Sequence, residues 1–205
     1  MIIEWPEFRK MALKLIDGGY IPIFGEMNEQ LEEVVIECIF VSKNTGKKSM
    51  TLLINSTGGW NLTYAAIKAA MIESGLEFNG LVMGRAFSNA FNLLQQCDTR
   101  SAVEDASLMF HWGNSRLGNQ ELAALIAGET WPVEHALAIE LMTAEQVSRR
   151  TGLSVEKLKE FALYERSFTA QQAFEMKFLD QVIRNLPKKV QQMLEDGKKD
   201  RKSKR

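Results

Sequence analysis

Two glycines, a serine and a histidine in this chain have the types and spacing that serine hydrolysis requires. Gly58-Gly59, Ser88 and His111 each follow an apolar run short enough to be a buried strand. All of them should therefore emerge at strand ends, where α/β folds place their chemistry. In such an enzyme Ser88 is the nucleophile and His111 is its base. The two glycines would belong to an oxyanion hole.

Each residue also has a structural interpretation that must be weighed against this one. A two-glycine turn often only accommodates the backbone, a serine before a helix is usually a cap, and a lone histidine is usually structural. The order of the features favours chemistry, because two of them open helices whose N–H groups would stabilise negative charge. The other histidine, His135, is expected to be a surface residue.

The elements that must position these residues alternate between strands and helices. Pro22 indicates an edge strand, because it cannot donate a hydrogen bond to a neighbouring strand. Strands joined through helices predict a mainly parallel sheet in an α/β fold. The expected elements are strands at 20–24, 50–54 and 80–83, helices at 29–42 and 62–73, and an apolar stretch at 90–94.

Beyond His111 the pattern becomes a long helical region at about 120–150, which Pro132 should kink or split. Its apolar residues occupy more than one face, so we expect it to pack against another subunit. Ser154 and Thr169 are expected to cap two later helices, and a closing strand is expected at 179–183.

The bulk properties fit one domain with tails. The chain has 205 residues, of which 45% are hydrophobic. Cys38 and Cys97 lie in apolar patterns and are interpreted as reduced core residues.

No leader or membrane span is recognised, so a cytoplasmic protein with no membrane partner is expected. The last segment is basic, with a local net charge of +5 over 188–205, and should be a flexible end; nucleic-acid binding is not expected.

Three motifs, in this order, resemble the proteolytic subunit of the Clp protease, a family of caseinolytic serine peptidases. They are Ile54–Gly59, Gly84–Leu94 and Met109–His111, and the resemblance extends over about 21–183. Its later part includes 150–152, 155–158 and 168–173, which look like the late helices and closing strand of the family.

The resemblance implies a crotonase-like ββα superhelix, the Clp peptidase fold, with a long protruding handle helix after the histidine. Ser88 falls on the family's nucleophile and His111 on its general base. Glu165 falls where the family usually has the aspartate that orients the histidine. The backbone N–H groups of Gly59 and Asn89 fall on the oxyanion hole. Neither a metal nor a cofactor is implied.

The resemblance also implies an assembly that degrades protein or peptide substrates. Family members form two stacked rings, usually of seven subunits, and region 120–150 would interlock them. An AAA+ unfoldase normally docks on the ring. On this interpretation 1–19 is an axial gate or a docking helix, 20–186 is the peptidase domain, and 187–205 is a basic flexible tail.

Several residues depart from the family pattern and suggest a divergent member. Glu165 is one methylene longer than aspartate, Thr57 replaces a proline, and Trp60 stands where smaller residues are usual. Asn89 replaces a methionine, a change expected to matter little because the oxyanion donor is backbone. Two alternatives therefore stay open beside an active serine endopeptidase: a catalytically weak or inert scaffold subunit of the same family, and a crotonase-type enzyme that uses CoA.

Overall fold

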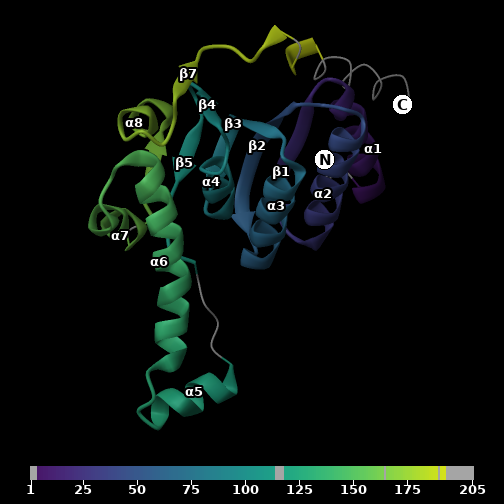
Figure 1. Ribbon diagram of the computed structural model, residues 1–205. Helices are drawn as coiled ribbons and strands as arrows, with labels where there is room; N and C mark the ends of the chain where they lie inside the picture. The colour runs from purple at the N-terminus through teal and green to yellow at the C-terminus, as the bar shows by residue number, and fades with distance from the viewer. Residues whose placement is uncertain (1–3, 114–117, 164, 189, 193–205) are drawn as a thin grey trace.

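A seven-stranded, mostly parallel sheet forms the centre of the protein (Figure 1). The structure is a computed structural model, and it describes residues 4–113, 118–163, 165–188 and 190–192. The strand order is β1-β2-β3-β4-β7, and β5 pairs with both β3 and β6. Only the β5–β6 pairing is antiparallel among the described pairs. The predicted α/β fold with a mainly parallel sheet is confirmed.

The strands are β1 (Tyr20–Met27), β2 (Ser49–Gly59), β3 (Glu77–Phe87), β4 (Thr99–Val103), β5 (Ser107–Met109), β6 (Ser167–Thr169) and β7 (Gln181–Ile183). β1 is an edge strand, as Pro22 indicated. Three strands are longer than predicted. β1 reaches Met27, β2 continues through the glycine pair, which stays paired with the end of β1, and β3 reaches Phe87. The sequence suggested turns there, because their polar and glycine residues suit turns as well as strand ends.

The helices are α1 (Trp5–Asp17), α2 (Glu29–Asn44), α3 (Asn61–Ser74), α4 (Asn89–Leu94), α5 (Asn119–Ile126), α6 (Trp131–Thr151), α7 (Val155–Leu163) and α8 (Ala170–Glu175). Figure 1 shows α6 projecting from the body, with α5 at its far end. Pro132 lies in the first turn of α6, where its missing N–H costs nothing, so the predicted region does split into two helices. The predicted caps at Ser154 and Thr169 are confirmed by their hydrogen bonds.

An aromatic cluster lies beneath the segments that carry the serine and the histidine. Phe91 of α4 and Phe110, which precedes His111, have ring centroids 5.6 Å apart. Phe178 stacks edge-on against Phe91 at 5.0 Å, and all three rings are buried. Such aromatic pairs add packing energy beyond the area that they bury. This cluster holds the start of α4 and the end of β5 against one core.

Both ends of the described chain pack on the domain. α1 buries Phe8, Ala12 and Ile16, and Arg9 pairs with Glu37 of α2. At the other end, residues 188 and 190–192 are helical, and Val190 is buried. The first residues of the segment expected to be a tail thus pack on the domain, where Val190 forms a small apolar cluster with Leu53 and Leu81. The rest of the predicted tail lies outside the described residues.

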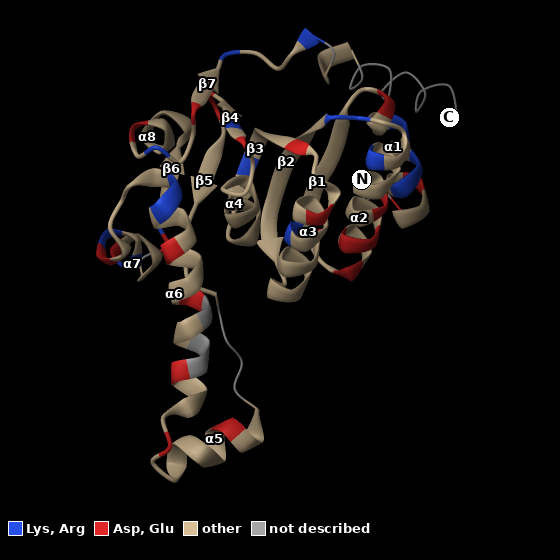
Figure 2. Ribbon diagram, viewed as in Figure 1, with Lys and Arg blue, Asp and Glu red and all other residues tan. Residues whose placement is uncertain are grey.

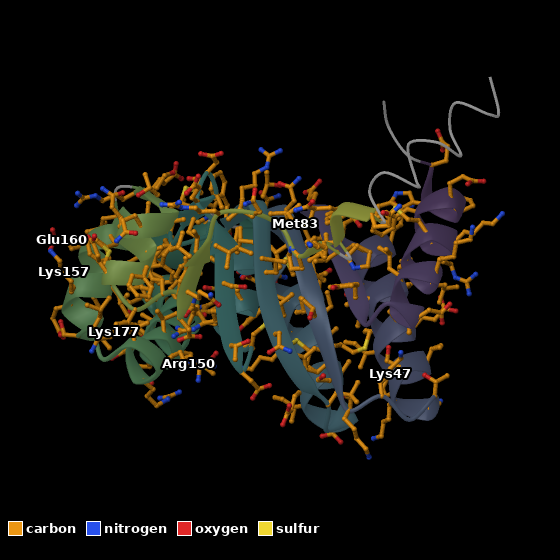
Figure 3. All side chains as sticks on the ribbon, turned by 90° about the horizontal axis from the view of Figure 1, so that it is seen from above. Lys47, Met83, Arg150, Lys157, Glu160 and Lys177 are labelled. Atoms are coloured by element: carbon orange, nitrogen blue, oxygen red, sulfur yellow. The ribbon has the colours of Figure 1, made fainter. Side chains whose placement is uncertain are left out.

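The view from above separates the two ends of the molecule (Figure 3). At one end Lys47 donates to the carbonyl of Asp17 at 3.2 Å, which holds the end of α1. At the other end Lys157 and Glu160 pair at 2.7 Å on α7. Between them, Arg150 at the base of α6 donates to the Cys97 carbonyl at 2.9 Å, so α6 is anchored to the loop after α4. The handle helix is thus fixed at its base to the body that carries the site.

Candidate active site

A pocket of about 440 Å³ opens where β1, β2, β3 and β5 end. Ser88, His111, Gly58 and Gly59 all contribute to its lining. The sheet register explains why they meet. Ser56 pairs with Ala86, and Phe87 pairs with Met109, so three strand ends lie side by side. The structure therefore brings together the residues that the sequence singled out as nucleophile, base and glycine turn.

Ser88 has an unusual backbone conformation at the edge of this pocket. Its φ is 54° and its ψ is −127°, values that residues other than glycine seldom adopt. It occupies the N-cap position of α4, yet its side chain makes no capping hydrogen bond. Its N–H donates to the carbonyl of Met109 at 3.0 Å, which fixes the turn to β5. The interpretation of Ser88 as a simple helix cap is therefore wrong, and its hydroxyl is left available at the pocket.

The glycine pair is required by close contacts with the backbone. A Cβ on Gly58, whose φ is +80°, would lie 2.5 Å from the carbonyl oxygen of Phe87 and 2.7 Å from Cβ of Ser88. A Cβ on Gly59 would lie 2.2 Å from the carbonyl oxygen of Met27. Real Cβ contacts are never so short, so no other residue fits at either position without backbone movement. The glycines thus allow β2 to touch both the serine turn and β1.

Ser56 and Met27 engage the N–H groups on either side of Gly59. The buried Ser56 hydroxyl accepts from the N–H of Gly58 at 3.0 Å and donates to the carbonyl of Gly25 at 2.6 Å. The N–H of Trp60 donates to the carbonyl of Met27 at 2.9 Å. These bonds hold the turn in a single conformation beside Ser88.

The side chain of Asn89 joins the glycine turn to the serine helix. Its Nδ2 donates to the carbonyl of Gly59 at 2.8 Å and to Oδ1 of Asn61 at 2.7 Å. Its Oδ1 accepts from Nδ2 of Asn92 at 3.0 Å, and the residue is only 5% exposed. The side chain of Asn89 thus has a structural role in the site, in addition to its backbone N–H. Sequence reasoning missed it because Asn61 and Gly59 approach Asn89 only through the fold.

His111 is mostly buried, and one carboxylate lies close to its inner nitrogen. Nδ1 of His111 is 3.4 Å from Oε1 of Glu165, the acid that the family resemblance implied. Among the described residues, however, Nδ1 has no partner with proper hydrogen-bond geometry. The Glu165 side chain is 65% exposed, and its φ of 46° is another unusual backbone value. The acid is thus close to the histidine but loosely held.

A second carboxylate, which sequence reasoning missed, lies behind the histidine. Oε1 of Glu140 accepts from the N–H of Gly113, two residues after His111, at 3.0 Å. Burial raises the pKa of Glu140, whereas the Gly113 hydrogen bond and the nearby His111 act in the opposite direction. Glu140 comes from α6, whose acidic residues are visible in Figure 2. Nothing local in the sequence marks it, because α6 reaches this loop only in the folded chain. The side chain of His135, also on α6, lies outside the described residues.

Both cysteines are core residues, as the sequence indicated. Cys38 and Cys97 are free and buried, and burial raises the pKa of each thiol to about 12. In the part of the chain that the structure describes, no group of three or more His, Cys, Asp or Glu side chains is placed to hold a metal ion.

No described helix combines the length and apolar character that crossing a membrane requires.

Comparison with known proteins points to one family. A family model described as Clp protease matches residues 6–186. The ATP-dependent Clp protease proteolytic subunit 2 of Thermobifida fusca is 24% identical over 185 residues, covering 89% of each chain. The ATP-dependent Clp protease proteolytic subunit 1 of Streptomyces avermitilis is 30% identical over 179 residues, covering 86% of this chain and 80% of the relative. The corresponding subunit of Ligilactobacillus salivarius is 25% identical and covers 85% of this chain and 88% of its own length.

Proposed function

The chain belongs to the Clp protease family, and from this premise we propose that Ser88, His111 and Glu165 are its catalytic triad. The protein is a serine protease of the Clp proteolytic-subunit type. A protease of this class needs one activated serine, and the pocket described above contains a single serine among its described lining residues. The triad assignment names the residues of this chain that would carry out the hydrolysis.

In the first step the Ser88 hydroxyl attacks the carbonyl carbon of the scissile peptide bond. Nε2 of His111 accepts the hydroxyl proton, and Glu165 beside Nδ1 orients the ring and stabilises the imidazolium that forms. The imidazolium then donates its proton to the leaving amine, and an acyl-enzyme on Ser88 remains. Water, deprotonated by the same histidine, hydrolyses the acyl-enzyme and restores the serine.

The negative charge on the carbonyl oxygen needs donors fixed in advance, and we assign these to the N–H groups of Gly59 and Asn89. The N–H groups of Gly58 and Trp60 are engaged elsewhere, which supports the choice of Gly59 within the turn. The packing of Gly58 against the start of α4 brings the turn next to the N–H of Asn89. Removing one donor of this kind costs about 10²–10³ in kcat in a serine protease.

The single observation that carries the proposal is the backbone of Ser88. A conformation of this kind costs about 1–3 kcal/mol and persists only where the surroundings impose it, most often at functional sites. The contacts of Gly58 and Met109 impose it here. A structural serine would need neither the strain nor an uncapped hydroxyl.

Glu165 can serve as the orienting acid after a small movement. A charge-assisted N–H···O bond is about 2.7–2.9 Å long, shorter than the 3.4 Å separation from Nδ1. Catalytic hydrogen bonds are often long in an unliganded enzyme and tighten when substrate binds. The exposed glutamate has the freedom to close the gap.

We further propose that the chain assembles into stacked rings through α5 and α6 and receives substrate from an AAA+ unfoldase, as members of this family do. Large apolar side chains are exposed along both helices and would be covered by a second subunit. They are Leu122, Ile126, Trp131, Val133, Leu137 and Met142. The ATP-dependence in the names of the relatives fits an unfoldase partner.

The experiment compares peptide hydrolysis by the native protein with that by Ser88→Ala, His111→Ala and the control Ser49→Ala, all at the same oligomeric state by sedimentation velocity. Ser49 is exposed at the start of β2, away from the pocket. We expect loss of about 10⁴-fold or more in kcat for the two site variants and none for the control. Turnover that survives in Ser88→Ala would contradict the assignment. An assembled native protein that hydrolyses nothing would favour the inert scaffold subunit.

A further inference from the structure

An acidic and an aromatic side chain flank the nucleophile in the same pocket. Glu26 and Trp60 both line it, beside Ser88. Glu26 pairs with Gly58 across the β1–β2 ladder, and Trp60 follows the glycine turn directly. The hydrogen bond from the Trp60 N–H to the carbonyl of Met27 fixes the two strand ends together. Glu26 and Trp60 are thus held on adjacent strands at the mouth of the site.

Both side chains are open to a ligand. Glu26 is exposed, and within the described residues it forms no ion pair. Trp60 is 51% exposed, so about half of its surface is open to a ligand.

The charge around the pocket is negative. Glu26 is the one acidic residue in the described lining, which holds neither lysine nor arginine. Glu165 and Glu140 do not line the pocket, but both lie near His111, which does. Charges of one sign that line a cleft raise the local concentration of oppositely charged groups. A cationic substrate side chain is therefore favoured near Glu26, and an anionic one is disfavoured.

A carboxylate next to an aromatic face is a chemical match for an ammonium or guanidinium group. The carboxylate accepts charge-assisted hydrogen bonds, and the indole ring attracts the cation through its quadrupole. Tryptophan is the best ring for this interaction. A purely apolar subsite would not place an unpaired carboxylate in its wall, because burying that charge beneath an apolar side chain is costly.

We propose that Glu26 and Trp60 form a subsite that selects a lysine or arginine side chain of the substrate close to the scissile bond. The inference rests on the proposed function, since a subsite has meaning only if Ser88 is the nucleophile. The inference specifies a class of substrate for the site, namely polypeptide segments that place a basic residue near the glycine turn when they bind.

The test uses internally quenched peptides that are otherwise uncharged and differ at one of the two positions on either side of the scissile bond. Each position carries lysine, norleucine or glutamate in turn. Norleucine has the aliphatic chain of lysine without the ammonium group, so the ratio of kcat/KM values isolates the charge. We expect lysine to be preferred over norleucine by about tenfold at one position, combining an exposed ion pair with a cation–π contact.

Substitutions of Glu26 and Trp60 test whether these two residues cause the preference for lysine. Glu26→Gln should lower the lysine-to-norleucine ratio to about two, and Glu26→Lys should reverse the order of lysine and glutamate. Trp60→Leu should lower the ratio about twofold to fivefold. The controls Glu29→Gln and Leu62→Ala should keep the native ratio, because both are exposed residues that do not line the pocket.

A measurement on the native protein avoids any question of misfolded variants. Raising NaCl from 50 to 500 mM should lower the lysine preference, since salt screens exposed charges, while the norleucine rate stays the same. A native ratio near one at all four positions, or a ratio unchanged in Glu26→Gln, overturns the inference while leaving Ser88 as the nucleophile. Hydrolysis of no peptide at all, together with no fluorophosphonate adduct on Ser88, overturns the proposed function and the inference together.

Discussion

The nucleophile side and the base side of the pocket are held in different ways. Ser88, the glycine turn and Asn89 are fixed by short backbone contacts and buried hydrogen bonds between strand ends. His111 has a loosely held partner in Glu165, which is 65% exposed and 3.4 Å away. One half of the site is therefore rigid in a single chain, and the other half can still adjust.

The difference follows from the elements that supply each half. The nucleophile side is built from β2, β3 and the start of α4, inside the core. The base side depends on the loop after α7 and on α6, through Glu140. α6 also exposes Trp131, Val133 and Met142. If subunits assemble through α6, their contacts would therefore influence the base side of the site and not the nucleophile side. Substitutions in the two halves should accordingly have effects of different size.

The largest effect is expected from Gly58→Ala. Its Cβ would collide with the Phe87 carbonyl and the Ser88 side chain, so kcat/KM should fall about a thousandfold or more. Gly46→Ala is a matched control, because Gly46 has nearly the same φ, +78°, and open space around it. The control should lose about 1 kcal/mol of stability and no activity. Equal loss of activity in both variants would show that φ alone matters and that the contact with Ser88 does not.

Asn89→Ala should come next, with a loss of about 30-fold in kcat. The variant removes the hydrogen bond to the Gly59 carbonyl and leaves Asn61 and Asn92 without a partner, at a cost of about 1–3 kcal/mol in stability. Steady-state kinetics and thermal unfolding measure the two effects. Asn79→Ala, which loses only the exposed bond with Thr99, is the control and should keep full activity.

Glu165→Gln should cost less, about tenfold in kcat, because an exposed and distant acid orients the histidine only weakly. Glu160→Gln, another exposed acid of the same region, should change nothing. A loss in Glu165→Gln greater than that in Gly58→Ala would reverse the comparison. It would show that the acid, and not the nucleophile turn, is the most constrained part of the site.

The smallest effect is expected from Glu140→Gln, and it should depend on pH. The glutamine keeps an oxygen for the Gly113 N–H but carries no charge. The folded pKa of Glu140 is raised by burial, so the carboxyl group stabilises the fold less as pH rises from its unfolded pKa through its folded pKa. The melting temperature of the variant should match the native value in acid and exceed it slightly at neutral pH. A variant less stable at neutral pH would indicate that the charge itself holds the loop.

Much of the fold was accessible from the sequence because its signals are local. Pro22 marked the edge strand, the periodicity marked α2 and α3, and Pro132 marked the start of α6. The strand ends were harder, since Gly58 stays in the sheet only through its pairing with Glu26 of β1.

The residues of the candidate site also divide into those that local sequence signals indicated and those that depend on tertiary contacts. Ser88 and His111 could be proposed from strand ends, whereas Glu165 came only from the family resemblance, because no local pattern connects it with His111. Glu140, Glu26 and the Asn89 side chain could not be predicted, since their contacts arise between segments far apart in the chain. Residues that act through tertiary contacts leave no mark in spacing or periodicity.

The most direct test of the central claim is covalent labelling with a fluorophosphonate, followed by peptide mass mapping. The account predicts one adduct on Ser88 in the assembled native protein, none in Ser88→Ala or His111→Ala, and slower labelling in Glu165→Gln. An adduct that persists in Ser88→Ala, or none on a well-assembled native protein, would contradict the assignment of Ser88 as the activated nucleophile.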